Sequence, residues 1–141
     1  TLAVAGGQQR RPDQRRKPEQ TLHAAAARYL SSILIPPCLY TTVPIGGGVT
    51  IRGAILRGLG TIKGWPDIQI VHDGRLFLVE LKSAKGRLSP AQKMVHTALL
   101  AAGCKVAVVR SLDELDAVLR DWVIPLRGQL LGTGAIQRGT P

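Results

Sequence analysis

Two acidic residues and a lysine have the types and the spacing to do chemistry. Asp67 precedes one apolar segment, while Glu80 and Lys82 end the next, and Asp73-Gly74 between them is a strong signal for a two-residue β-hairpin turn. A hairpin that turns there pairs Asp67 with Glu80, at a β-carbon separation of about 5 Å. Strand alternation points Lys82 to the same side as Glu80. The spacing alone therefore predicts two carboxylates and an ammonium group at one place.

Carboxylates this close together repel each other, so a cation is expected between them. Two such groups offer the hard oxygen ligands that suit Mg²⁺ or Mn²⁺. The chain is otherwise strongly basic, because 19 Lys and Arg against 9 Asp and Glu give a net charge of +10, and a field of this sign attracts nucleic acid. The cation would polarise a phosphoryl oxygen and lower the pKa of a water molecule, while Lys82 orients that water or neutralises the developing charge.

A purely structural explanation stands beside this one. Glu80 and Lys82 could form an ion pair on an exposed strand face, with Asp67 only starting a strand after Pro66.

Helices are expected on both sides of the hairpin. Pro18 suits the first turn of a helix that Pro36-Pro37 ends. Its apolar side chains at helical spacing are Leu22, Ala26, Tyr29, Leu30 and Ile33. Ser89 and Gln92 form a capping box that starts a second helix. The stripe expected to be buried on that helix is Ala91, Met94, Val95, Ala98, Leu99 and Ala102, with Gly103 closing it.

A second capping box, Ser111 with Glu114, predicts a third helix that ends before Pro125. A strand of the buried type is expected over 104–109 and a short strand over 38–44. Because a helix connects strand 76–81 to strand 104–109, these two strands should be parallel, and the fold should be α/β with a mixed β-sheet flanked by helices.

The domain organisation follows from the ends of these elements. Residues 1–17 are expected to be a flexible basic arm, either solvated or following phosphates, and 18–124 one domain. Residues 125–141 are expected to be a Gly-rich tail or exchange arm. A short helix is expected over 50–59, after the Gly46-Gly47-Gly48 loop.

The cysteines and histidines suggest no metal site of their own. Cys38 and Cys104 are far apart and are expected to be reduced, packed thiols. The three scattered histidines, His23, His72 and His96, are each expected at a surface or interface. Since no apolar run is long enough for a membrane span and no secretion signal is present, an intracellular protein that is cytoplasmic or associated with the nucleoid is expected, in a bacterial or phage context, without a membrane partner.

The pattern of "PD", a hairpin and then "ELK" resembles the PD-(D/E)XK nuclease superfamily. The segments "VPIGGG", "GLGTIKGWPDIQI", "LFLVELKSAKGRLSPAQ" and "GCKVAVVRSLDE" narrow the resemblance to the virus-type replication-repair nuclease domain, VRR-NUC, over residues 19–122. The family often has Asn after the Pro of the Gly loop, where this chain has Ile45. The resemblance implies a restriction-endonuclease-like core and a Mg²⁺- or Mn²⁺-dependent deoxyribonuclease.

The resemblance also implies roles for individual residues. Asp67 and Glu80 would hold the metal together with the main-chain carbonyl of Leu81, and Lys82 would serve the nucleophile. Glu19 of the first helix and Gln92 would join the catalytic set; their alternative roles are interaction with a helix N-terminus and completion of the capping box.

Substrate and partners are expected from charge and resemblance together. The basic residues expected to hold DNA phosphates are Arg52, Arg57, Lys63, Lys85, Arg87 and Lys93. Aromatic residues make up only 4% of the chain, which favours backbone recognition over base stacking. Similar stand-alone enzymes imply a homodimer that cuts branched DNA such as Holliday junctions. The rivals are a sequence-specific restriction-type nuclease and a basic nucleic-acid-binding module without hydrolysis.

Overall fold

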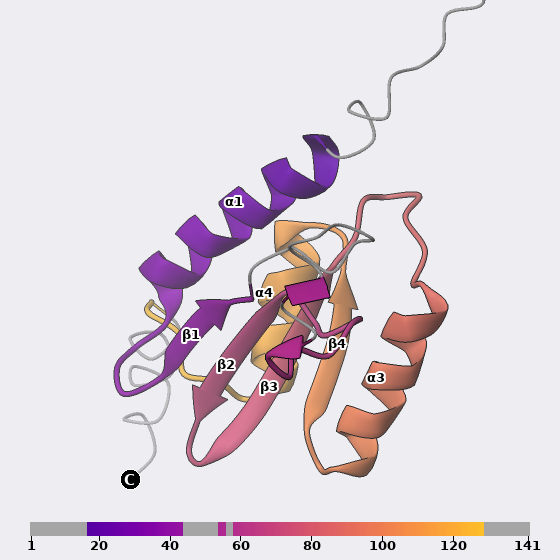
Figure 1. Cartoon of the computed structure of the whole chain (residues 1–141). Helices are drawn as coiled ribbons and strands as arrows, with labels where there is room; N and C mark the ends of the chain where they lie inside the picture. Colours follow the sequence, from indigo (N-terminus) through magenta and orange to yellow (C-terminus); the bar gives the residue numbers. More distant parts are fainter. Residues whose placement is uncertain (1–16, 44–53, 56–57, 129–141) are drawn as a thin grey trace, which may run out of the picture.

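The computed structural model describes residues 17–43, 54–55 and 58–128 of the chain. In chain order its elements are α1 (Lys17–Ile33), β1 (Leu39–Thr42), β2 (Ile68–His72), β3 (Arg75–Leu81), α3 (Pro90–Ala101), β4 (Lys105–Val109) and α4 (Leu112–Asp121). Figure 1 shows the strands side by side, with α1 and α3 on opposite sides of the view and α4 behind the sheet. Within the described residues, the expected strands and the three longer expected helices are thus present, and the α/β prediction is confirmed.

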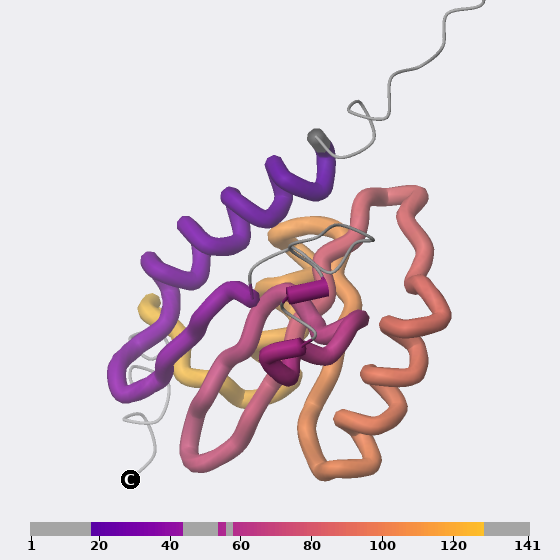
Figure 2. The backbone as a smooth tube through the Cα atoms, viewed as in Figure 1, coloured from indigo at the N-terminus to yellow at the C-terminus, as the bar shows by residue number. Residues whose placement is uncertain are grey.

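The strands form a mixed sheet in the order β1-β2-β3-β4. β1 pairs with β2 and β2 with β3 in antiparallel fashion, whereas β3 and β4 are parallel, as expected for strands joined through a helix. The turn between β2 and β3 is formed by Asp73 and Gly74, with φ values of 50° and 71°. Two successive positive φ angles are the geometry of the predicted two-residue turn, and His72 pairs with Arg75 as that turn requires. The tube in Figure 2 follows this hairpin into α3 and back to β4.

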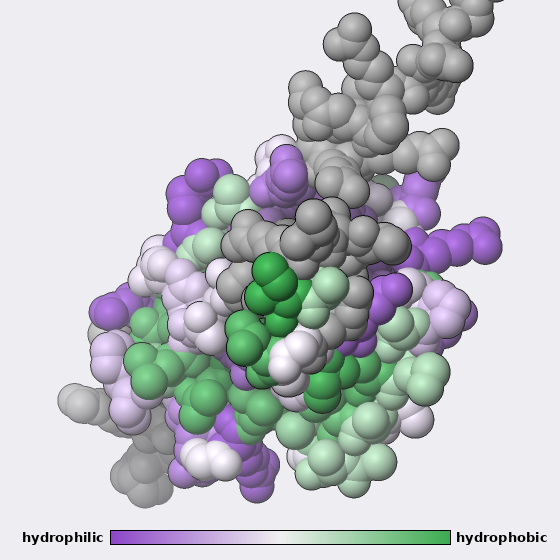
Figure 3. Space-filling view, in the orientation of Figure 1, coloured by the Kyte–Doolittle hydropathy of each residue, from purple (hydrophilic) through white to green (hydrophobic). Residues whose placement is uncertain are grey.

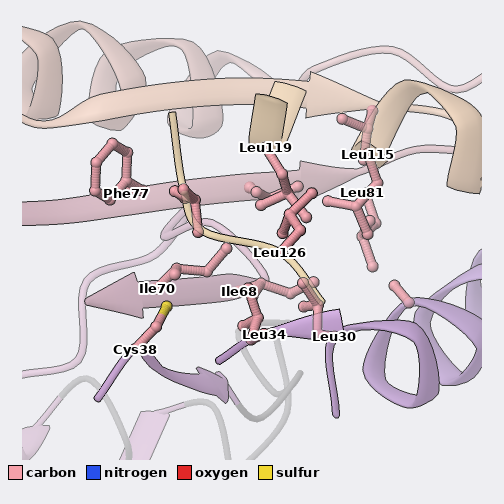
Figure 4. Close-up of a cluster of buried hydrophobic side chains, with 14 residues drawn as sticks. Leu30, Leu34, Cys38, Ile68, Ile70, Phe77, Leu81, Leu115, Leu119 and Leu126 are labelled. Carbon is pink, nitrogen blue, oxygen red and sulfur yellow. The ribbon is translucent and has the colours of Figure 1, made fainter. Parts of the chain in front are cut away.

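The main hydrophobic core lies between one face of the sheet and the helices α1 and α4 (Figure 4). Its buried residues are Ala26, Leu30, Leu34, Cys38, Ile68, Ile70, Phe77, Val79, Leu81, Val109, Leu115, Leu119, Ile124 and Leu126. Alternate residues of β3, among them Leu78 and Glu80, point to the other face and are also buried. One face of β3 therefore packs against the core, and the other carries Glu80.

Several details of burial differ from the sequence expectation. On α3 the buried residues are His96 and Leu99, while Met94 is 74% exposed and Ala98 and Ala102 are exposed as well. The side of α3 that meets the sheet is therefore rotated relative to the stripe predicted from the sequence.

β4 is also less buried than predicted. Of its residues only Val109 is fully buried, since β4 is an edge strand of the sheet.

One residue of the expected C-terminal tail, Leu126, belongs to the core. Leu126 has no exposed surface and forms an isolated β-bridge with Leu34, and the Arg127 N–H donates to the carbonyl of Ile33 at 2.8 Å. The packed unit therefore extends beyond residue 124, because the segment after α4 returns to the end of α1.

Both helix caps were predicted from the sequence. At α3 the capping box is complete: the Ser89 side chain accepts from the Gln92 N–H, and the Gln92 side chain accepts from the Ser89 N–H. At α4 only half of the box forms, because Ser111 accepts from the Glu114 N–H while the Glu114 carboxylate accepts from the Arg110 N–H instead.

Other expectations lie outside the described residues. These are the basic arm up to residue 16, Ile45, the Gly46–Gly48 loop, Arg52 and Arg57 with most of the helix over 50–59, and the tail from residue 129. Cys38 and Cys104 are free thiols, as predicted, with Cys38 buried. Within the part of the chain that the structure describes, no helix combines the length and the apolar character needed to cross a membrane.

Candidate active site

Asp67 stands at the entrance of β2 and reaches across to β3. Its main-chain carbonyl accepts from the Val43 N–H at 2.8 Å, which fixes the backbone beside β1. Its side chain accepts from the Leu81 N–H through Oδ2 at 2.7 Å. The ladder of β2 and β3 ends at Ile68 and Val79, so Asp67 continues the register that would pair it with Glu80. The hairpin thereby brings the two carboxyl groups to the same place.

Glu80 is a buried carboxyl group with donors on one oxygen only. Its side chain is 2% exposed. Oε1 accepts from Nε2 of Gln92 at 2.6 Å and lies 3.7 Å from Nζ of Lys82. Oε2 is buried and has no hydrogen-bond partner among the described residues. It lies 3.8 Å from Nε2 of His96. A buried carboxylate with a vacant oxygen costs free energy unless a proton or a cation compensates it.

The electrostatics of the two acids reflect that shortage of positive charge. Burial is the main cause that raises the pKa of Glu80 to about 8; the negative charge of Asp67 adds to this rise, and the positive charge of Lys82 opposes it. The pKa of Asp67 is raised too, mainly by burial, against the hydrogen bond from Leu81 and the charges of His23 and Lys82, which lower it. Two neighbouring carboxyl groups with raised pKa values retain a proton at neutral pH or exchange it for a cation.

The first turn of α1 brings a third acid to the site. Oε1 of Glu19 accepts from the Ser83 N–H at 3.4 Å, a weak contact that crosses from α1 to the end of β3. The negative charge of Glu19 also raises the pKa values of Asp67 and Glu80. Glu19 therefore acts on the site and not only on its own helix N-terminus.

Gln92 completes the capping box of α3 and also contacts Glu80. Its Oε1 accepts from the Ser89 N–H at 2.8 Å, which completes the cap of α3. Its Nε2 donates to Oε1 of Glu80 at 2.6 Å. Because the two ends of one amide make these bonds, the cap holds the donor in position for Glu80.

Two further features hold the surrounding loops, and the sequence did not single them out. Gly64 has φ +90°, and a β-carbon there would lie 2.6 Å from the Ala91 carbonyl carbon and 2.8 Å from the Gln92 nitrogen. The turn at residue 64 thus packs its backbone directly on the first turn of α3, which only Gly permits.

Arg110 donates through Nη1 to the carbonyls of Ser83 at 2.6 Å and Gly86 at 2.7 Å, which braces the loop after β3.

The sequence predicted each histidine at a surface or interface, and this prediction is wrong for His96. His96 is buried, 8% exposed, and lies beside Glu80, while His23 on α1 is half-buried and close enough to influence Asp67. Burial lowers the pKa of His96. The spacing of His23 four residues after Glu19, and of His96 four residues after Gln92, is the signal that could have placed each on the same helical face as a site residue.

Four of the six basic residues predicted to hold DNA phosphates are described, and all four are exposed. They are Lys63, Lys85, Arg87 and Lys93, from the turn before β2, the loop before α3 and the first turn of α3. Figure 3 shows hydrophilic side chains projecting over that loop, while hydrophobic ones gather lower on the same face. The four basic residues thus lie on segments adjacent in sequence to Asp67, Glu80 and Gln92.

The residues fit a divalent cation by the chemistry of the donor set. In residues 17–43, 54–55 and 58–128 no group of three or more His, Cys, Asp and Glu side chains is arranged as a metal site. An ion would therefore bind through Asp67 and Glu80, with main-chain oxygen and water completing its shell, as Mg²⁺ commonly does. The vacant Oε2 of Glu80 and the raised pKa values of both acids are what such an ion would relieve.

The fold resembles known nuclease domains. One solved structure, described as a "VRR_NUC domain", matches with a TM-score of 0.50 and 20% identity over 73% of this chain and 95% of the other. A second, described as a "VRR_NUC domain protein", matches with a TM-score of 0.54 and 16% identity over 77% of this chain and 87% of the other. No protein-family model matches the sequence, and no curated protein matches it. The chain thus has the fold of these domains, as the sequence motifs predicted.

Proposed function

We propose that this chain is a nuclease of the VRR-NUC type that hydrolyses DNA phosphodiester bonds with Mg²⁺ or Mn²⁺. One observation carries the proposal: Asp67 and the buried Glu80 meet beside Lys82, and Glu80 keeps one oxygen without a partner. A structural ion pair on an exposed strand does not account for this arrangement, because Glu80 is buried and Lys82 is only 12% exposed. The shared fold with VRR-NUC domains supports the same conclusion.

The residues divide the chemistry among them. The divalent ion, when bound by Asp67, Glu80 and the Leu81 carbonyl, supplies Lewis-acid polarisation of the phosphate and a lower pKa for a water molecule. Lys82 places its ammonium group next to Glu80, where it orients the attacking water and neutralises charge that develops on the phosphate. Gln92 holds the Glu80 carboxylate, and Glu19 adds negative charge at the rim of the site.

The substrate is inferred from the surface around these residues. Lys63, Lys85, Arg87 and Lys93 are exposed near the carboxylates and would hold phosphates without reading sequence. Arg52 and Arg57 are proposed for the same task. With 4% aromatic residues, the chain is poorly equipped to stack unpaired bases, so we infer recognition of duplex or branched DNA, such as a Holliday junction. A homodimer would supply the two sites needed to cut two strands symmetrically.

Cleavage assays test the function. The full chain is mixed with a labelled four-way junction or a linear duplex, with Mg²⁺, Mn²⁺ or EDTA. We expect cutting that needs the metal and prefers the junction, and a dimer by light scattering. Equal cutting of many duplexes would remove the structure selectivity, and cutting at one fixed sequence would favour a restriction-type enzyme.

Variants of the carboxylates test the site itself. Asp67→Asn and Glu80→Gln should each reduce cleavage more than about 100-fold while leaving DNA binding nearly unchanged, because the phosphate contacts lie on other residues. Asp73→Asn is the matched control: it makes the same chemical change at the exposed far end of the hairpin, and Asn tolerates its positive φ. Normal DNA binding without cleavage by the unaltered protein under every metal condition would instead identify a binding module.

A further inference from the structure

His96 lies against the carboxylate on which the proposed site depends. It follows Gln92 by one helical turn of α3, so both side chains leave the helix on the same side. Gln92 reaches Oε1 of Glu80, and His96 lies next to Oε2. One helix thus presents two nitrogen-bearing side chains to the two oxygens of one carboxyl group.

The pair of His96 and Glu80 is incomplete. Nε2 of His96 and Oε2 of Glu80 are both buried, neither has a hydrogen-bond partner within the described residues, and they lie 3.8 Å apart. A hydrogen bond between nitrogen and oxygen needs about 2.7–3.2 Å, so a side-chain movement of less than about 1 Å would form one. Each of the two atoms costs free energy while it stays unpaired, and the same bond would relieve both.

We infer that His96 is a positioning residue for Glu80, donating from Nε2–H to Oε2 while Gln92 donates to Oε1. The inference rests on the proposed function, in which Glu80 binds the divalent ion. Two donors, one on each oxygen, prevent the Glu80 carboxylate from rotating. Its remaining lone pairs then stay directed at the ion that it would share with Asp67. Groups that orient a metal-binding carboxylate in this way change metal affinity about 10- to 100-fold when removed.

Direct binding of the ion by His96 is the competing arrangement. A hydrated Mg²⁺ or Mn²⁺ ion needs room for water beside each ligand. Because Nε2 of His96 is inaccessible to solvent, a hydrogen bond from it to Glu80 fits the geometry better than its direct binding of an ion with a water shell.

Mn²⁺ binding by the full-length protein tests the inference without relying on activity. Dissociation constants are measured by the electron paramagnetic resonance of free Mn²⁺ for the unaltered protein, His96→Leu and His96→Gln. We expect His96→Leu to weaken Mn²⁺ binding at least about 10-fold, because Oε2 of Glu80 loses its donor, while a cooperative thermal transition shows that the variant is folded. His96→Gln, whose amide can donate from a similar position, should remain within about 3-fold of the unaltered protein.

Two controls accompany these variants. His72→Leu removes another buried nitrogen without a partner, at the turn end of the hairpin, and should leave Mn²⁺ binding unchanged. His96→Met is a second apolar replacement, which adapts more easily to the site should Leu not be accommodated.

The outcomes separate this inference from the proposed function. If the unaltered protein binds Mn²⁺ and cuts DNA but both apolar variants at position 96 bind Mn²⁺ equally well, His96 has no positioning role and the nuclease assignment stands. If pulsed electron paramagnetic resonance detects a nitrogen coupled to Mn²⁺, and His96→Leu abolishes that coupling, then His96 is a ligand and the positioning role is wrong. If the unaltered protein binds Mn²⁺ no better than Asp67→Asn, the proposed metal site and this inference both fall.

Discussion

Replacing Glu80 by Gln should change how the stability of the metal-free protein depends on pH. Burial and the charge of Asp67 raise the pKa of Glu80 from 4.5 to about 8. The folded protein therefore holds this proton more tightly than the unfolded chain does. The resulting stability is fully present below about pH 4.5 and is lost as the pH rises through 8, because the buried carboxyl group must then ionise.

The size of the effect follows from the same values. They are about 3.5 pH units apart, and each pKa unit corresponds to about 1.4 kcal/mol, which sets an upper limit of about 5 kcal/mol. Asp67 is coupled to Glu80 and also has a raised pKa, so the two groups share the cost of ionisation. We expect about 2 to 3 kcal/mol of this difference between pH 5 and pH 8.

Urea denaturation in EDTA at pH 5, 6, 7 and 8 measures the effect. The free energy of unfolding is extrapolated to water for the unaltered protein and for Glu80→Gln. Because Gln does not ionise, the difference between the two proteins reports the ionisation of Glu80 together with its coupling to Asp67, and the groups that do not interact with Glu80 cancel. Glu80→Gln should gain stability relative to the unaltered protein as the pH rises, and saturating Mn²⁺ should reduce that gain by stabilising the ionised carboxylate.

A difference that stays constant within about 0.5 kcal/mol from pH 5 to pH 8 would refute this reasoning. It would mean that the Glu80 carboxyl group is solvated in the folded protein, in conflict with its 2% exposure.

Two other substitutions test how the site and the core are held. Gly64→Ala places a β-carbon 2.6 Å from the backbone of α3, whereas the control Gly60→Ala, with a similar φ of +94°, meets open space. In thermal denaturation, the loss of stability in Gly64→Ala should exceed that in Gly60→Ala by about 2 kcal/mol, and Gly64→Ala should also bind Mn²⁺ more weakly. Equal losses for the two variants would show that only φ strain matters. Leu126→Ala should cost about 2–4 kcal/mol in urea denaturation, because Leu126 is fully buried in the core. A loss below about 0.5 kcal/mol would mean that the segment after α4 is a dispensable tail.

Local signals in the sequence predicted the parts of the fold that depend on neighbouring residues. Asp73-Gly74 set the register of the hairpin because a two-residue turn leaves only one pairing, and that register placed Asp67 near Glu80. The caps at Ser89 and Ser111 were equally local, since each side chain bonds a backbone group three residues away.

Burial was harder to predict where two helical faces are similar in composition. On α3 the sequence favoured a stripe that includes Met94, but the structure buries His96 and Leu99 and leaves Met94 exposed, because His96 packs beside Glu80 of the sheet. The burial of Leu126 was not predicted, because its partner Leu34 is distant in sequence and no residue near Leu126 indicates the contact. Gly64 and Arg110 likewise act only through residues that folding brings to them.

The double use of Gln92 restricts what the chain can tolerate at that position. Glu is the usual alternative at the third position of a capping box, and Gln92→Glu would preserve the bond to the Ser89 N–H. It would also replace the donor 2.6 Å from Oε1 of Glu80 by a second anion. A change that is silent in most helices would here set two carboxylates against each other, so the start of α3 and the acidity of the site cannot vary independently.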